Sequence, residues 1–144
     1  MIPERLILFT LGGEEFACSL QQIGEVMEPL QSYPFAGAPA HYLGLINFHG
    51  NLTALVDLAL YLGLKSRPIP GKLLVLDPRL AHLALKVDGV SAIIASDLVT
   101  GEEPGEDPLT EAYLETPSGR VRLLQLEALI DELENGLKQA PARI

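Results

Sequence analysis

The sequence predicts a mostly β protein made of small closed or sandwiched β structures. Three observations support this: about nine or ten short runs typical of strands, tight-turn signals between them, and one longer helical pattern near the end. No alternating β–α repeat appears, which argues against a doubly wound parallel sheet. The length of 144 residues allows one domain, or two very small units that share a core.

The N-terminal part predicts a hairpin followed by a short helix. Residues 6–11 form an apolar run typical of a buried strand, the Gly-Gly pair that follows suits a tight turn, and residues 15–18 fit the returning strand. The Ser-x-x-Gln pattern that begins at Ser19 is a capping box, and the apolar period after it is helical. We therefore expect a helix over 19–27, ended by Pro29.

The middle of the chain predicts a second hairpin between short helices. In order, we expect an irregular stretch over 30–38, a short helix over 39–43, strands over 44–48 and 52–56, and a helix over 58–62. Gly50 and Asn51 are the expected hairpin turn, Asp57 the cap of the second helix, and Gly63 its end. Two prolines and a glycine make residues 65–71 the best internal boundary.

The second half predicts further strands and the longer helix. We expect strands over 73–76, 83–87, 90–95, 112–115 and 121–126. Residues 97–115 hold seven acidic side chains and no base, which is typical of a solvated loop, and their spacing does not match a calcium loop. An apolar stripe over 126–137 predicts an amphipathic helix. The expected subdomains are 1–64 with 121–137, and 72–120, joined by the boundary loop 65–71.

The composition limits the classes of partner. Ten basic and 19 acidic residues give a net charge of −9, which disfavours nucleic acid and anionic membrane as direct partners. No apolar stretch has the length of a membrane span or a secretory core, so a cytoplasmic protein is expected. Cys18 is the single cysteine, so neither an internal disulfide nor a Cys-rich zinc site can form.

The residues that could carry chemistry are few. No serine sits in a G-x-S-x-G elbow, no phosphate-binding loop follows the glycines, and no metal-ligand spacing appears, so we expect no catalytic residue, metal or cofactor. One alternative remains open: a small β-barrel enzyme or ligand-binding domain that uses His41, His49 and Asp57. The leading interpretation is binding through apolar surface, with a partner helix in a groove between two small barrels.

Several segments resemble CheW-like chemotaxis coupling proteins. Residues 9–17, Phe-Thr-Leu-Gly-Gly-Glu-Glu-Phe-Ala, and Ile-Gly-Glu-Val at 23–26 resemble the family's opening hairpin and its V-x-E-V or I-x-E-V element. Residues 44–58, which begin Gly-Leu-Ile-Asn-Phe-His-Gly, resemble the more specific block G-x-x-N-L-R-G-x-x-x-P-V-x-D-L. Val-Asp-Gly-Val at 87–90 and the closing stretch 123–130 extend the likeness over nearly the whole chain.

The resemblance implies a single CheW-like domain over 1–144: two small SH3-like five-stranded β-barrels that share a hydrophobic seam, with short helices and a C-terminal amphipathic helix. It also implies an adaptor without catalysis. Its partners would be the cytoplasmic helical tip of a chemoreceptor and the regulatory domain of a CheA-type histidine kinase, which has the same fold. The resemblance places partner-binding positions at Ile23, Glu25, Val26, Leu43, Gly44, Ile46, Asn47, His49 and Val87.

The chain departs from the family pattern at the partner-binding block and elsewhere. His49 stands where the family usually has Arg, and a neutral imidazole lacks the fixed charge and two-pronged donor of a guanidinium. Ala54 replaces the usual Pro, Ala84 the usual Gly, and Ala92 an acidic residue. These changes leave the strand pattern intact, so we expect the same fold with a divergent partner surface.

Overall fold

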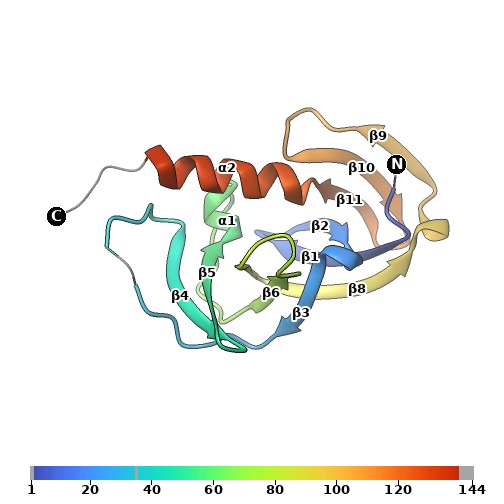
Figure 1. Ribbon diagram of the computed structural model, residues 1–144. Helices are drawn as coiled ribbons and strands as arrows, with labels where there is room; N and C mark the ends of the chain where they lie inside the picture. Colours follow the sequence, from blue (N-terminus) through green and yellow to red (C-terminus); the bar gives the residue numbers. More distant parts are fainter. Residues whose placement is uncertain (1, 35, 140–144) are drawn as a thin grey trace.

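The computed structural model describes residues 2–34 and 36–139, and its eleven strands form two sheets (Figure 1). The first sheet has six strands in the order β8-β1-β2-β11-β10-β9. These are β1 Arg5–Leu11, β2 Glu14–Ser19, β8 Gly89–Ala95, β9 Gly101–Pro104, β10 Thr110–Thr116 and β11 Gly119–Leu124. The second sheet has five strands in the order β3-β6-β7-β5-β4. These are β3 Ile23–Met27, β4 Tyr42–Phe48, β5 Asn51–Asp57, β6 Lys72–Leu76 and β7 Leu83–Val87.

This arrangement confirms the mostly β prediction and the two small SH3-like β units, although the first sheet has six strands rather than five. The strand order divides the chain differently from the expected subdomains. Residues 5–19 pair with strands from 89–124, and the intervening residues 23–87 make up the second sheet. The segment 65–71 therefore lies inside the second unit. Sequence order alone could not reveal this, because the parallel pair β11–β2 joins segments about a hundred residues apart.

Three apolar clusters explain why the central strands are apolar on both faces. Leu6 and Leu8 of β1 pack with β10 and β11 inside the first unit, whereas Ile7, Phe9 and Leu11 face the opposite way into a larger cluster. In the second unit, Leu73 and Val75 of β6 face its interior, and Leu74 and Leu76 face the same larger cluster. This larger cluster, the seam, is shared by both units, so the predicted common seam is present.

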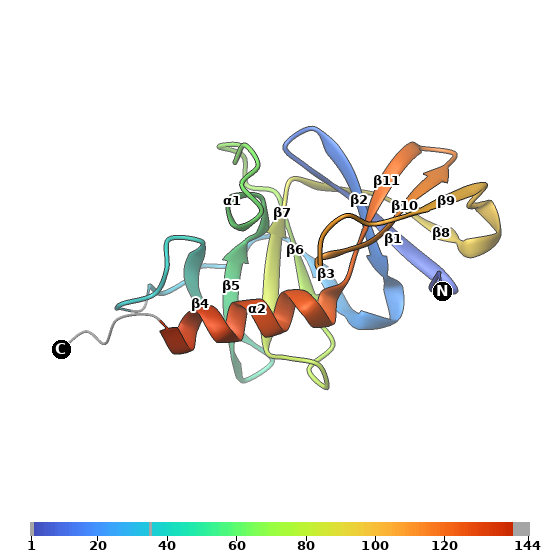
Figure 2. The ribbon, with the colours of Figure 1, turned by 90° about the horizontal axis from the view of Figure 1, so that it is seen from above.

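Helix α2, Leu126–Gln139, closes the seam and confirms the predicted C-terminal helix. Its stripe Leu126, Leu129, Ile130 and Leu133 is buried in the seam, and its acidic residues lie on the exposed side. Figure 2 shows α2 running from the end of β11 across the strands of the second unit toward β4. The hydroxyl of Tyr42 on β4 donates to the carbonyl of Leu133 at 3.4 Å, and the Tyr61 hydroxyl donates to Glu132 at 2.7 Å.

The short helix α1, Leu58–Tyr61, also matches its prediction. The Asp57 carboxylate accepts from the Leu60 amide at 3.2 Å and caps the helix, and its other oxygen accepts from the Ser66 hydroxyl at 2.9 Å. Gly63 follows with a positive φ of 74°, the conformation expected of a helix stop.

Three further predictions, all of local secondary structure, are wrong. The helix expected over 19–27 is a single 3-10 turn, η1 Leu20–Gln22, followed by strand β3, and the Ser19 side chain makes no capping bond. Ile23 pairs with Leu76 instead, because tertiary strand pairing outweighs a weak local helical pattern. The helix expected over 39–43 is a turn that leads into β4 at Tyr42. The acidic stretch is not one loop, because β9 and much of β10 lie within 97–115.

Candidate partner-binding surface

The hairpin of β4 and β5 carries the most distinctive surface of the second unit. Its two-residue turn is His49-Gly50, one residue earlier than the predicted Gly50-Asn51. Both residues have positive φ, 49° and 82°, as a primed turn requires, and the Gly50 amide donates to the Asn47 side chain at 3.0 Å. Histidine is among the residues that tolerate this backbone region, so His49 can occupy the first turn position.

The turn position sets which side chains stand together outside the hairpin. Asn47 lies opposite Leu52, and Leu45 lies opposite Ala54. Leu45 is also paired on its other side with Tyr33, through two backbone hydrogen bonds of 2.8 Å. Residues directly opposite each other share a face of a sheet. We call this set the hairpin face: Tyr33, Leu45, Asn47, Leu52 and Ala54.

The hairpin face is unusually apolar for an exposed surface. Leu52 is 70% exposed and Tyr33 is 60% exposed, the two highest values among the large apolar side chains of the described residues. The inward-facing neighbours Ile46, Thr53 and Leu55 are buried. The hairpin therefore buries apolar side chains on its inner face and also exposes apolar side chains on its outer face. An apolar outer face on a small barrel is typical of a protein-binding surface.

An ion pair links the hairpin turn to the opposite edge of the sheet. His49 Nε2 lies 3.5 Å from the Glu25 carboxylate on β3, although three strands separate β3 from β4 in the sheet order. This contact requires the sheet to curve round until its two edges meet, as in a small barrel. Both side chains are largely exposed, so the pair contributes little to stability.

The structure separates the predicted partner-binding residues into three groups by exposure. Glu25, Val26, Leu43, Asn47 and His49 are exposed, and all five lie on β3, β4 or the hairpin turn. Ile23 is partly buried and packs against the seam. Gly44, Ile46 and Val87 are buried, Ile46 inside the second unit and Val87 in the seam. The predicted positions that are open at the surface are therefore the five on β3, β4 and the hairpin turn.

Sequence reasoning missed four members of the hairpin face: Tyr33, Leu45, Leu52 and Ala54. Two causes are visible. A turn at Gly50-Asn51 would place Leu52 opposite His49 rather than Asn47, and residues 30–38 were expected to be irregular, with no strand contact for Tyr33. The Asn47-x-x-Gly50 spacing, in which the Asn side chain accepts from the Gly amide, is the signal that could have placed the turn correctly.

The alternative site of His41, His49 and Asp57 is not assembled. His41 and His49 lie at opposite ends of β4, which an extended strand of that length separates by roughly 25 Å. The His41 ring packs against the rings of Tyr42 and Tyr61 at centroid distances of 4.8 and 4.7 Å, and its burial lowers the pKa of the imidazole. Asp57 is occupied as a helix cap.

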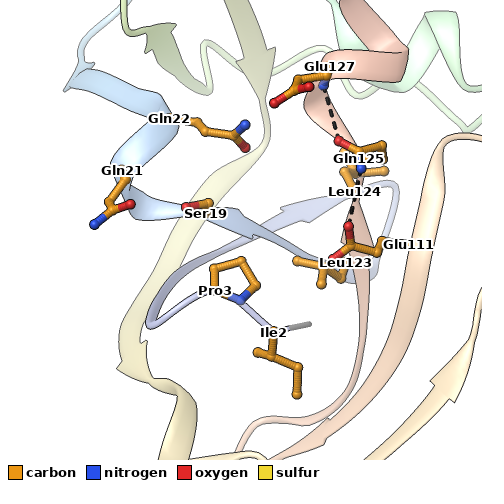
Figure 3. A pocket seen from close by; sticks show the side chains of 10 residues that line it. All are labelled: Ile2, Pro3, Ser19, Gln21, Gln22, Glu111, Leu123, Leu124, Gln125 and Glu127. Atoms are coloured by element: carbon orange, nitrogen blue, oxygen red, sulfur yellow. Dashed lines mark hydrogen bonds between the residues drawn. The ribbon is translucent and has the colours of Figure 1, made fainter.

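Cys18, the single cysteine of the chain, lies in the core. Burial raises the pKa of the Cys18 thiol to about 12, so this thiol stays protonated in the core. Within residues 2–34 and 36–139, no three His, Cys, Asp or Glu side chains are placed to share a metal ion. The pocket in Figure 3 is lined mainly by amides, carboxylates and apolar side chains, and Glu111 is already hydrogen-bonded to Gln125 at 3.2 Å.

Comparisons with known proteins agree with this fold. A family model described as "CheW-like domain" matches residues 5–134. A probable chemotaxis protein CheW of Rhizobium etli is 30% identical over 141 residues, 90% of this chain and 89% of that protein. The chemotaxis protein CheW of Rhizobium meliloti is 31% identical over 91 residues, 62% of this chain and 59% of that protein.

The solved structure of the scaffolding protein TtCheW from Thermoanaerobacter tengcongensis has the same fold, with a TM-score of 0.76. Its sequence is 19% identical, and the match covers 89% of this chain and 92% of that one. In the part of the chain that the structure describes, neither helix has the length and apolar character needed to cross a bilayer.

Proposed function

The chain belongs to the CheW-like family, and from this premise we propose that it is a cytoplasmic, non-catalytic adaptor that couples a chemoreceptor to a CheA-type histidine kinase. The receptor would bind through its cytoplasmic helical tip, and the kinase through its regulatory domain. Family membership supports the role of a chemotaxis scaffold. The assignment of the two partners rests on the family resemblance together with the exposed apolar surface of this chain.

The hairpin face is the observation that carries the proposal. Exposing Leu52 and Tyr33 on one face of the sheet forgoes the stabilisation of burying them, so such a patch is kept for binding rather than for folding. The exposed residues Leu43 on β4 and His49 in the hairpin turn adjoin it, and Glu25 on β3 pairs with His49. Together they give an apolar patch with a polar rim, which is the usual composition of a protein–protein interface.

The shape of this surface favours the kinase domain as its occupant. The outer face of a small barrel is convex, whereas an amphipathic partner helix needs a groove. A folded domain with its own apolar sheet face fits a convex patch better. Weak contacts would suffice in a signalling array, because neighbouring contacts raise the effective concentration of each partner.

Binding of the purified partners tests the proposal directly. The chain is titrated by calorimetry with the regulatory domain of the CheA-type kinase from its source organism, with a receptor-tip fragment, and with both together. We expect binding to each alone and a ternary complex on size exclusion. Absence of binding to both partners would refute the proposal, and binding to the receptor tip alone would remove the kinase from it.

A further inference from the structure

Gly44 belongs to the predicted partner-binding set, but it is buried and has no side chain with which to contact a partner. Its φ of +145° is a conformation that L residues rarely adopt. A Cβ built at this position would lie 2.7 Å from the carbonyl oxygen of Tyr33 and 2.9 Å from its carbonyl carbon, both backbone atoms. Any residue other than glycine must therefore push the Tyr33 segment away.

The segment that Gly44 admits is held to β4 as a short extra strand. The Tyr33 amide donates to the Leu45 carbonyl, and the Leu45 amide donates to the Tyr33 carbonyl, each at 2.8 Å. The Ser32 hydroxyl adds a weaker bond to the Leu43 carbonyl at 3.4 Å. Pro34 follows directly, and a residue before proline is biased toward the extended backbone that this pairing needs.

The docked segment presents Tyr33 to solvent beside the hairpin. The side chain is 60% exposed. A tyrosine adds contact area at low entropic cost and can donate one hydrogen bond, and tyrosines are enriched among residues that dominate binding energy. Its position opposite Leu45 makes it continuous with Leu52 and Asn47 on the hairpin face.

We propose that Tyr33 is a contact residue for the regulatory domain of the kinase, and that Gly44 is a positioning residue that admits Tyr33 to the hairpin face. This inference rests on the proposed function. Gly44 then affects binding indirectly, through the position of Tyr33. The partner surface also includes the segment around Tyr33, whose sequence shows no strand pattern.

The test compares binding of the kinase regulatory domain by calorimetry across four variants. Tyr33→Ala should weaken binding about tenfold, as expected for an interface tyrosine, without changing the thermal midpoint by more than a few degrees. Gly44→Ala should weaken binding by a similar factor. The double variant should bind no worse than either single one, because both changes remove the same contact. Gly119→Ala is the matched control: it also places alanine at a positive φ, its Cβ meets no atom within 4 Å, and it lies in the first sheet, away from the hairpin face.

A fluorescence measurement reports the position of the segment independently of binding. The chain contains no tryptophan, so Tyr33→Trp introduces a single indole at the site. Gly44→Ala in this background should shift the indole emission, whereas Gly119→Ala should not. If Gly44→Ala does not fold, Pro34→Gly loosens the same segment without altering β4, and it should weaken binding two- to threefold.

The outcomes separate this inference from the proposed function. If the unchanged chain binds the regulatory domain and Tyr33→Ala binds equally well, Tyr33 is not a contact and the inference is wrong. An unshifted indole emission in Gly44→Ala, or additive losses in the double variant, would refute the positioning role. If the unchanged chain does not bind the domain at all, the proposed kinase coupling fails and the Tyr33 contact fails with it.

Discussion

Strands β1 and β4 have the same length and similar apolar sequences, Arg-Leu-Ile-Leu-Phe-Thr-Leu and Tyr-Leu-Gly-Leu-Ile-Asn-Phe, yet they have opposite roles. β1 lies inside the first sheet between β8 and β2 and is buried on both faces. β4 lies at the edge of the second sheet and alternates between buried and exposed residues. The difference shows that position in the sheet, rather than composition, separates a strand that holds the fold from one that offers a surface.

Removing a large side chain from β1 should give the largest loss of stability. Phe9 is fully buried in the seam and packs against Phe16 with ring centroids 5.9 Å apart. Phe9→Ala should lower the free energy of unfolding by about 3–5 kcal/mol, because it leaves a cavity where the two units meet. Urea unfolding followed by circular dichroism measures this, and a loss below about 1 kcal/mol would show that the seam can collapse around the gap.

The inward face of β4 should behave like β1. Ile46 is fully buried inside the second unit with Leu55 and Val75. Ile46→Ala should cost about 2–5 kcal/mol of unfolding free energy, and binding per folded molecule should change little, since the side chain cannot reach a partner. The same denaturation and calorimetry experiments check both parts. A large loss of affinity with unchanged stability would place Ile46 in the interface instead.

The outward side of β4 should show the reverse pattern. Leu43 is 37% exposed, and Leu43→Ser should weaken binding of the kinase regulatory domain about fivefold, or roughly 1 kcal/mol, with a smaller loss of stability. Leu98→Ser is a matched control, because Leu98 is 45% exposed but lies beside the first sheet. Equal effects of the two variants on binding would contradict the assignment of the surface to β4.

His49 should give the smallest effect. His49→Arg supplies a charge that does not depend on pH and a guanidinium that can face both Glu25 and a partner carboxylate. We expect kinase binding to strengthen by about twofold to fivefold, because the guanidinium brings a fixed charge and a two-pronged donor to the interface. Titration calorimetry measures this. Unchanged affinity would place His49 outside the interface.

The sequence by itself determined much of the fold. Continuous apolar runs identified β1, β6 and β7, the Asp57 cap and Gly63 stop identified α1, and a 3.6-residue apolar period identified α2. These signals are local, because each depends on residues a few positions apart. The family block at 44–58 also directed attention to the β4–β5 hairpin, where the exposed candidates Asn47 and His49 lie.

Only the tertiary structure decided which apolar residues form a surface. Ile46 and Leu52 look equivalent in sequence, but one is fully buried and the other is 70% exposed. The outcome depends on a turn placed at His49-Gly50, on the edge position of β4 and on the docking of Tyr33 against Gly44. Pairing between segments distant in sequence is set by the summed burial of whole faces, so local patterns could not assign β3 to a strand or Tyr33 to the surface.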